Sequence, residues 1–169
     1  MLKRVKFFIT TLLIILITTF TVYRFFPSVV QKALTKKKFY DAHLKIKSIE
    51  LEDITYSYAE GGEKNDEIIV LVHGFNSDKS TKIAYAKKLM DKYHVILPDL
   101  PGHGQTTRPV NQKYDIYSLR DRLEEFMQAK KIDKPVTMIA SSMGGGIVTV
   151  YAHKYPQKIK KMILINPLG

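Results

Sequence analysis

Ser142 is the residue of this chain whose surroundings best fit nucleophilic chemistry. It lies in the segment 140–145 (Ala-Ser-Ser-Met-Gly-Gly), after the apolar run 136–139 and before a helical pattern that extends over 145–155. A serine on a sharp turn between a strand and a helix exposes its hydroxyl, which can attack an acyl carbon once a neighbouring base accepts the proton. The segment therefore predicts a catalytic serine. A Ser/Gly-rich loop that only caps a helix is the alternative.

Two adjacent serines compete for this role. The turn needs small residues two positions before and two positions after the nucleophile, because its two flanks approach each other closely. Ala140 and Gly144 occupy these positions around Ser142, whereas the matching neighbours of Ser141 are a bulky isoleucine and methionine. Ser142 is therefore the predicted nucleophile, with one methyl group at Ala140 as a tolerable departure from glycine.

The elements around this turn predict a parallel sheet. Ile68–Val72 is a continuous β-branched and leucine run, as expected for a strand buried on both faces. Apolar strand segments alternate with helical stretches, which is typical of consecutive βαβ units. The further expected strands are 95–97 and 160–165, and the expected helices are 81–93, 116–131 and 145–155.

Four segments in this order resemble the α/β-hydrolase fold family: Val-His-Gly-Phe at 72–75, Asp-Leu-Pro-Gly-His-Gly at 99–104, Ser-Ser-Met-Gly-Gly at 141–145 and Leu-Ile-Asn-Pro-Leu-Gly at 164–169. The amino-terminal apolar segment adds a resemblance to its membrane-anchored, monoacylglycerol-lipase-like branch. The resemblance covers about 54–169, the amino-terminal portion of that fold.

The resemblance implies a serine ester hydrolase that acts on lipid or other acyl esters, without a metal or organic cofactor. Ser142 would be the nucleophile. The backbone N–H groups of Phe75 and Met143 would form the oxyanion hole, and His73 would support the loop that carries Phe75.

The chain after Ser142 contains no aspartate, no glutamate and one histidine, His153. His153 lies about three helical turns beyond the serine, too far to reach its hydroxyl at the roughly 2.6–3.2 Å that proton transfer needs. The family places its acid and its base after the serine. We therefore expect a truncated form with little or no activity on its own. A non-catalytic, membrane-tethered binding module and one half of a split hydrolase completed by a second polypeptide are the alternatives.

The amino terminus predicts a membrane anchor. Three basic residues precede 7–23, a stretch of seventeen uncharged residues that would span about 26 Å as a helix. Bulky residues follow it where a signal-peptide cleavage site needs small ones, so an uncleaved anchor is expected. The basic flanks leave the side of the membrane open.

The net charge of +11 is concentrated beside this anchor. Residues 1–47 contain ten Lys or Arg and one acidic residue, whereas the remaining residues contain seventeen basic and fifteen acidic ones. Anionic lipids could attract this basic segment, and a solvated linker helix is an equal alternative. No basic face interleaved with aromatic residues is evident in the rest of the chain, so nucleic-acid binding is not expected.

These observations predict three parts: an anchor over 1–26, a basic helix or linker over 27–47, and a hydrolase portion over 48–169. The alternation of apolar residues over 47–58 predicts an antiparallel edge strand, followed by a turn over 59–66. The strand 160–165 would be an apolar sheet edge, which favours aggregation of the isolated chain.

Overall fold

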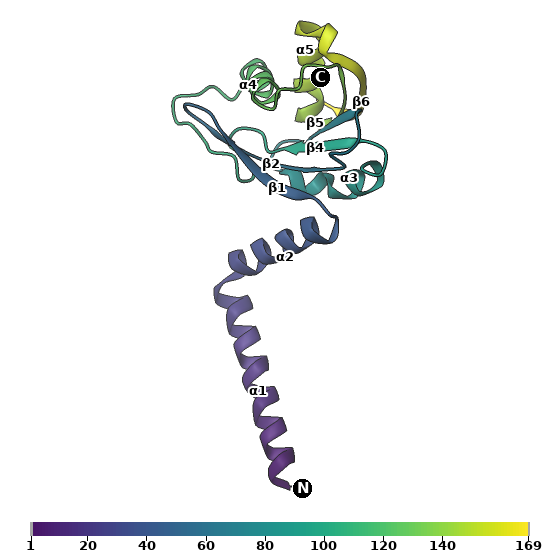
Figure 1. The fold of residues 1–169 in the computed structure, drawn as a ribbon. Helices are drawn as coiled ribbons and strands as arrows, with labels where there is room; N and C mark the ends of the chain where they lie inside the picture. The colour runs from purple at the N-terminus through teal and green to yellow at the C-terminus, as the bar shows by residue number, and fades with distance from the viewer. Residues whose placement is uncertain (1, 169) are drawn as a thin grey trace. The chain divides into compact units, whose positions relative to one another are not determined.

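A computed structural model describes residues 2–168, which separate into two compact units, Met1–Lys38 and Phe39–Gly169. The first unit holds helix α1 (Leu2–Phe25) and most of helix α2 (Pro27–Asp41) (Figure 1). None of the side chains of α1 is buried, and its length and composition allow it to cross a membrane. Threonine hydroxyls of α1 donate to carbonyl groups four residues earlier, for example Thr18 to Ile14 at 2.7 Å, which satisfies them within the helix.

The second unit is built on a six-stranded sheet in the order β1-β2-β4-β3-β5-β6. β1 pairs antiparallel with β2, and β2 pairs antiparallel with β4. The pairs β3–β4, β3–β5 and β5–β6 are all parallel. The strands are β1 (Lys45–Glu50), β2 (Thr55–Gly61), β3 (Ile68–Val72), β4 (His94–Pro98), β5 (Val136–Ser142) and β6 (Ile159–Pro167).

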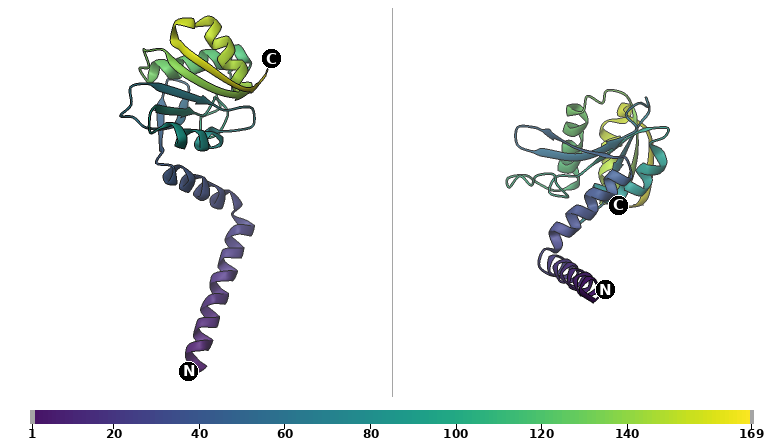
Figure 2. Two further views of the ribbon diagram at one scale, coloured as in Figure 1. Left: turned by 90° about the vertical axis from the view of Figure 1, so that its right-hand side faces the viewer. Right: turned by 60° about the horizontal axis from the view of Figure 1, so that its bottom comes forward.

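Helices cover both faces of this sheet (Figures 1 and 2). α4 (Ile116–Ala129) and α5 (Met143–Lys154) pack on one face, and α3 (Ile83–Leu89) packs on the other. The alternation along β3 explains both contacts, because Val70 and Val72 join the core under α4 and α5 while Ile69 and Leu71 join the core under α3. Two short 3₁₀ turns, η1 (Lys79–Lys82) and η2 (Pro156–Lys158), complete the elements.

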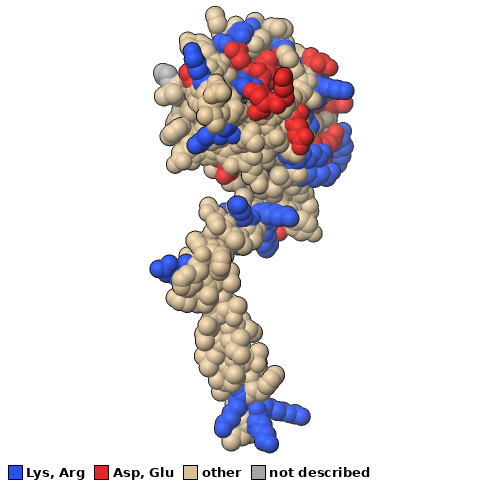
Figure 3. Space-filling view, turned by 90° about the vertical axis from the view of Figure 1, so that its left-hand side faces the viewer, with Lys and Arg blue, Asp and Glu red and all other residues tan. Residues whose placement is uncertain are grey.

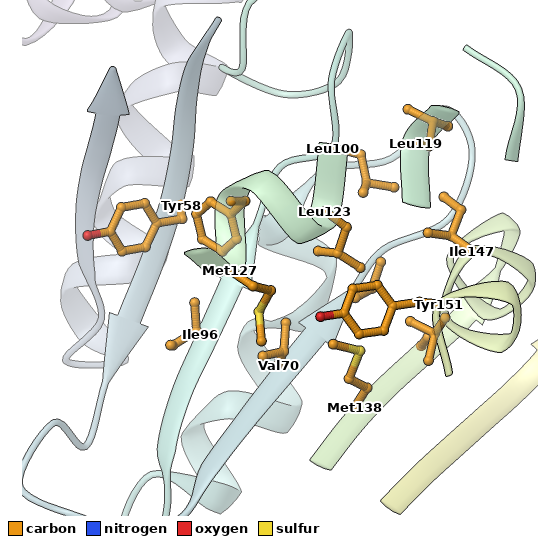
Figure 4. Close-up of a cluster of buried hydrophobic side chains, with 14 of the residues drawn as sticks. Tyr58, Val70, Ile96, Leu100, Leu119, Leu123, Met127, Met138, Ile147 and Tyr151 are labelled. Carbon is orange, nitrogen blue, oxygen red and sulfur yellow. The ribbon is translucent and has the colours of Figure 1, made fainter. Parts of the chain in front are cut away.

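The larger core lies between the sheet and the helices α4 and α5 (Figure 4). Phe126 is fully buried and its ring packs against Tyr56 and Tyr58 at centroid distances of 5.4 and 5.5 Å. Tyr151 of α5 donates a 2.6 Å hydrogen bond to Glu124 of α4, so the buried hydroxyl also ties the two helices together. This core fixes α5, and with it the turn that precedes it.

The structure corrects two predictions near the start of this unit. The single strand expected over 47–58 is a hairpin of β1 and β2, whose turn is closed by the Leu51 N–H donating to the Ile54 carbonyl group at 2.9 Å. The alternation in the sequence skips a residue between these two positions, and that break marks the turn. The turn expected from 59 begins later, because β2 continues to Gly61.

The basic segment expected over 27–47 is helical only to Asp41, and β1 begins at Lys45. His43 between them has a φ of 56°, which ends the helix. The expected helix 81–93 is the shorter pair η1 and α3. The remaining expected strands and helices lie where the sequence predicts them, within a few residues at each end.

Candidate active site

Ser142 occupies a strained turn between β5 and α5. It is the last residue of β5 and the residue before the first turn of α5, with φ 50° and ψ −126°. Few residues other than glycine adopt this conformation, which costs about 1–3 kcal/mol and clusters at functional sites. The side chain of Ser142 is exposed and makes no capping hydrogen bond to α5. The capping alternative therefore does not explain why a serine stands here.

Glycines allow the loop after β3 to pass directly beside this turn. A Cβ added at Gly74 would lie 3.1 Å from the Cβ of Ser142, and one added at Gly144 would lie 2.3 Å from the carbonyl oxygen of His73. The parallel pairing of Val72 with Ala140 brings the carboxyl ends of β3 and β5 to the same sheet edge. The two segments singled out in the sequence, 72–75 and 141–145, therefore meet in space.

His73 is buried under this loop and braces it. Its Nε2 accepts a hydrogen bond from the Leu100 N–H at 3.0 Å, so Nδ1 carries the proton and donates to the Gly74 carbonyl group at 2.8 Å. Burial lowers the pKa of His73 and outweighs the hydrogen bond to Gly74 and the nearby Asp99, both of which raise it. A neutral His73 is what the acceptor role of Nε2 requires.

Phe75 and Met143 are the residues predicted to supply backbone N–H groups to an oxyanion beside Ser142. Met143 is the first residue of α5, where the N–H has no acceptor within the helix, and such helix starts favour developing negative charge. Phe75 follows the close contact at Gly74, and its side chain is 75% exposed. The oxyanion role of both residues stays a prediction, consistent with these positions.

A cavity of about 530 Å³ opens beside Phe75. Asp78, His103, Arg108 and Tyr114 are among the residues that line it, and Ser142 is not. The rings of Phe75 and His103 meet edge to face at 6.0 Å. The cavity is thus next to the predicted nucleophile rather than around it.

Two buried lysines near the turn were not predicted from the sequence. Lys79 pairs with the fully buried Asp99 at 2.5 Å, and Asp99 also accepts hydrogen bonds from the backbone N–H groups of Lys79 and Gln105. Asp99 therefore orders its own turn, and its carboxylate oxygens bond to Lys79 and Gln105 rather than to Ser142. Lys82, 5% exposed, donates to the Ser141 hydroxyl at 2.6 Å. Lys79 and Lys82 lie in a polar segment of the sequence, and nothing in that segment indicates that they are buried.

Within residues 2–168, no hydrogen bond joins the Ser142 hydroxyl to a histidine or a carboxylate. His153 is exposed on α5, and His103 Nδ1 contacts the Pro101 carbonyl oxygen at 3.0 Å. The same residues contain no group of three or more His, Asp or Glu that could hold a metal ion. The described residues thus place no proton acceptor in hydrogen-bond contact with Ser142, the predicted nucleophile.

Comparison with known proteins agrees with this geometry. The sequence profile of the alpha/beta hydrolase fold matches residues 67–169. The chain belongs to the α/β-hydrolase fold family. Within that family it is similar to Lipase 1 of Psychrobacter immobilis, with 39% identity over 114 residues that cover 66% of this chain and 35% of the lipase.

Two further α/β-hydrolase relatives are informative. The monoacylglycerol lipase ABHD6 of Homo sapiens is 29% identical over 128 residues, which cover 75% of this chain and 38% of that enzyme. The crystal structure of a bacterial membrane phospholipase A superposes with a TM-score of 0.80 and 30% identity, covering 97% of this chain and 53% of that one. This chain therefore spans little more than a third of the length of these curated relatives.

Proposed function

We propose that this chain carries the nucleophile and the oxyanion donors of a membrane-anchored serine carboxylic-ester hydrolase. Ser142 attacks the acyl carbon, and the backbone N–H groups of Phe75 and Met143 stabilise the oxyanion that forms. His73 holds the loop that carries Phe75. The observation that carries the proposal is the backbone of Ser142, because φ 50° and ψ −126° cost free energy that an ordinary capping serine avoids.

The proposed substrates are esters of lipids. The relatives named as lipases and as a monoacylglycerol lipase support this class, as does the likeness to a membrane phospholipase A. The proposed anchor is α1, whose 24 residues and apolar composition suit a single span. An anchored enzyme would meet its substrates in the bilayer that holds it.

Residues 2–168 alone are proposed to have little or no ester turnover. A serine hydroxyl is a weak nucleophile without an adjacent base, and an oxyanion hole by itself gives only residual rate enhancement. The acid and the base would then come from residues outside this range, in the same polypeptide or in a second one that completes the fold.

A non-catalytic, membrane-tethered binding module is the second candidate. The cavity of about 530 Å³ beside the exposed Phe75, together with a Ser142 hydroxyl that has no proton acceptor within 2–168, favours it. Under this alternative, an apolar ligand would bind beside Phe75 and its binding would survive Ser142→Ala.

The test uses the full chain in lipid nanodiscs with a fluorophosphonate and a short-chain aryl ester. We expect slow fluorophosphonate labelling in which the Ser142 oxygen bonds to phosphorus, fluoride leaves and the hydroxyl proton passes to solvent water. Ser142→Ala should abolish this labelling and Ser141→Ala should retain it, with ester turnover near background. Labelling unchanged in Ser142→Ala would overturn the assignment of the nucleophile. Absence of labelling, combined with lipid binding that survives Ser142→Ala, would favour the binding module.

A further inference from the structure

One side of α2 combines basic and apolar side chains. Positions 29, 32, 33 and 36 are separated by three or four residues, so Val29, Lys32, Ala33 and Lys36 lie along the same side of the helix. All four are exposed, Val29 at 57%. We call these four residues the basic face of α2.

The charge of this segment is almost entirely of one sign. Asp41 is the one acidic residue in the sequence up to residue 47, and it lies more than a turn beyond Lys36. In Figure 3, basic side chains lie at both ends of an uncharged stretch of α1. Anions outside the chain therefore meet an excess of positive charge at the basic face.

α2 follows the candidate membrane span almost without a break. α1 ends at Phe25 and α2 begins at Pro27, and the Phe26 N–H still donates to the Val22 carbonyl group at 2.9 Å. The basic face begins two residues into α2. If α1 spans the bilayer, this face starts at the level where the headgroups begin.

We propose that the basic face of α2 binds the headgroups of anionic phospholipids, so that α2 lies on the membrane surface. The proposal rests on the membrane span proposed for α1. Val29 and Ala33 enter the boundary between headgroups and acyl chains, while the lysine stems lie along that boundary and their ammonium groups reach the lipid phosphates. Each lysine strengthens such an association about fivefold.

The experiment uses the absence of tryptophan from the chain. Ala33→Trp places a single reporter on the basic face, and the matched Gln31→Trp places one about 200° around the same helix. The full chain is reconstituted into vesicles of phosphatidylcholine alone or of an equal mixture with phosphatidylglycerol, each with brominated acyl chains as quenchers. We expect Ala33→Trp to shift to the blue and to be quenched only in the anionic vesicles, while Gln31→Trp keeps the emission of a solvated side chain.

Charge variants test the electrostatic cause. Adding Lys32→Gln and Lys36→Gln to Ala33→Trp should weaken the association about 25-fold, the product of two fivefold factors. Lys87→Gln with Lys88→Gln removes the same charge from exposed positions on α3 and should leave the signal unchanged. Equal emission in both vesicle types, or an unaffected Lys32/Lys36 variant, overturns the proposal while the span stands. Release of the chain by alkaline carbonate would show instead that the span itself is wrong, and the proposal for α2 fails with it.

Discussion

Lys82 Nζ donates a 2.6 Å hydrogen bond to the hydroxyl of Ser141, the residue directly before the predicted nucleophile. The lysine is buried, and its ammonium also lies 5.6 Å from the centre of the Tyr85 ring. Burial lowers the pKa of Lys82 because the charged form loses hydration. The end of β5 therefore contacts a buried ammonium group whose charged form is destabilised by the loss of hydration.

This relationship predicts how stability changes at alkaline pH. The pKa of Lys82 is lower in the folded than in the unfolded chain, so above the folded value the unfolded state binds more protons. The penalty of the buried charge falls as the pH rises through the folded pKa towards the ordinary value near 10.5. Compared with Lys82→Met, the wild-type chain should therefore gain stability over this range. Urea unfolding at several pH values measures it, and parallel profiles would contradict the prediction.

Replacing His73 should loosen the loop beside Ser142. His73→Phe leaves the Leu100 N–H without its acceptor and the Gly74 carbonyl group without its donor, at a cost of about 1–3 kcal/mol at neutral pH. The matched control is His153→Phe at an exposed position. Equal stability of the two variants in urea unfolding would refute the bracing role.

His73 should also make stability fall in mild acid. Because its pKa is lower in the folded chain than the ordinary value near 6.5, the unfolded chain takes up the proton first as the pH falls. Stability should be lost from about pH 6.5 downwards until the folded pKa is passed. In His73→Phe this contribution disappears, which a comparison of unfolding curves at pH 7 and pH 5 would reveal. A wild-type slope that persists in the variant would assign it to other groups.

Gly144 should not tolerate a side chain. In Gly144→Ala the new Cβ would lie 2.3 Å from the His73 carbonyl oxygen, so either the loop or the helix start must move, at a cost of roughly 1–3 kcal/mol. Gly146→Ala gains the same helix propensity, and its Cβ meets the Leu168 carbonyl oxygen at a milder 3.0 Å. Thermal unfolding of both variants gives the comparison. A Gly144→Ala chain as stable as Gly146→Ala would show that the two segments are not in close contact.

The outer edge of β6 should promote self-association of this chain. β6 pairs only with β5 among the described strands, and Met162 and Ile163 are 38% and 43% exposed. Ile163→Lys places a charge on this edge and should lower the aggregated fraction in sedimentation velocity runs. Val110→Lys adds the same charge at a 94% exposed loop position and serves as the control. Equal aggregation of both variants would exclude the edge as the cause.

The sequence predicted the parts of the site that depend on neighbouring residues. The small residues around Ser142 and the apolar run before it are local signals, and the structure places a strained turn there. The hairpin of β1 and β2 was missed because its alternation was followed across a two-residue interruption between Leu51 and Ile54.

Other features lay beyond a sequence-based prediction because they join distant segments. Nothing in the stretch around Lys79 and Lys82 distinguishes these lysines from solvated ones. Their partners, Asp99 and Ser141, are set by how the turn η1 meets the ends of β4 and β5. The same holds for Glu60, a buried carboxylate whose partners Lys47, Lys130 and His94 come from three separate segments of the chain.

Because β3 lies next to β5, hydrogen exchange in β3 can report whether the turn at Ser142 is folded. The contact between Gly74 and Ser142 depends on one parallel ladder that joins segments far apart in the chain. If the β3–β5 ladder opened, the contact between Gly74 and Ser142 would be lost even where local hairpins and helices persisted. Slow deuterium uptake at the β3 amides that donate to β5 would therefore report an intact turn at Ser142, with no substrate or inhibitor required.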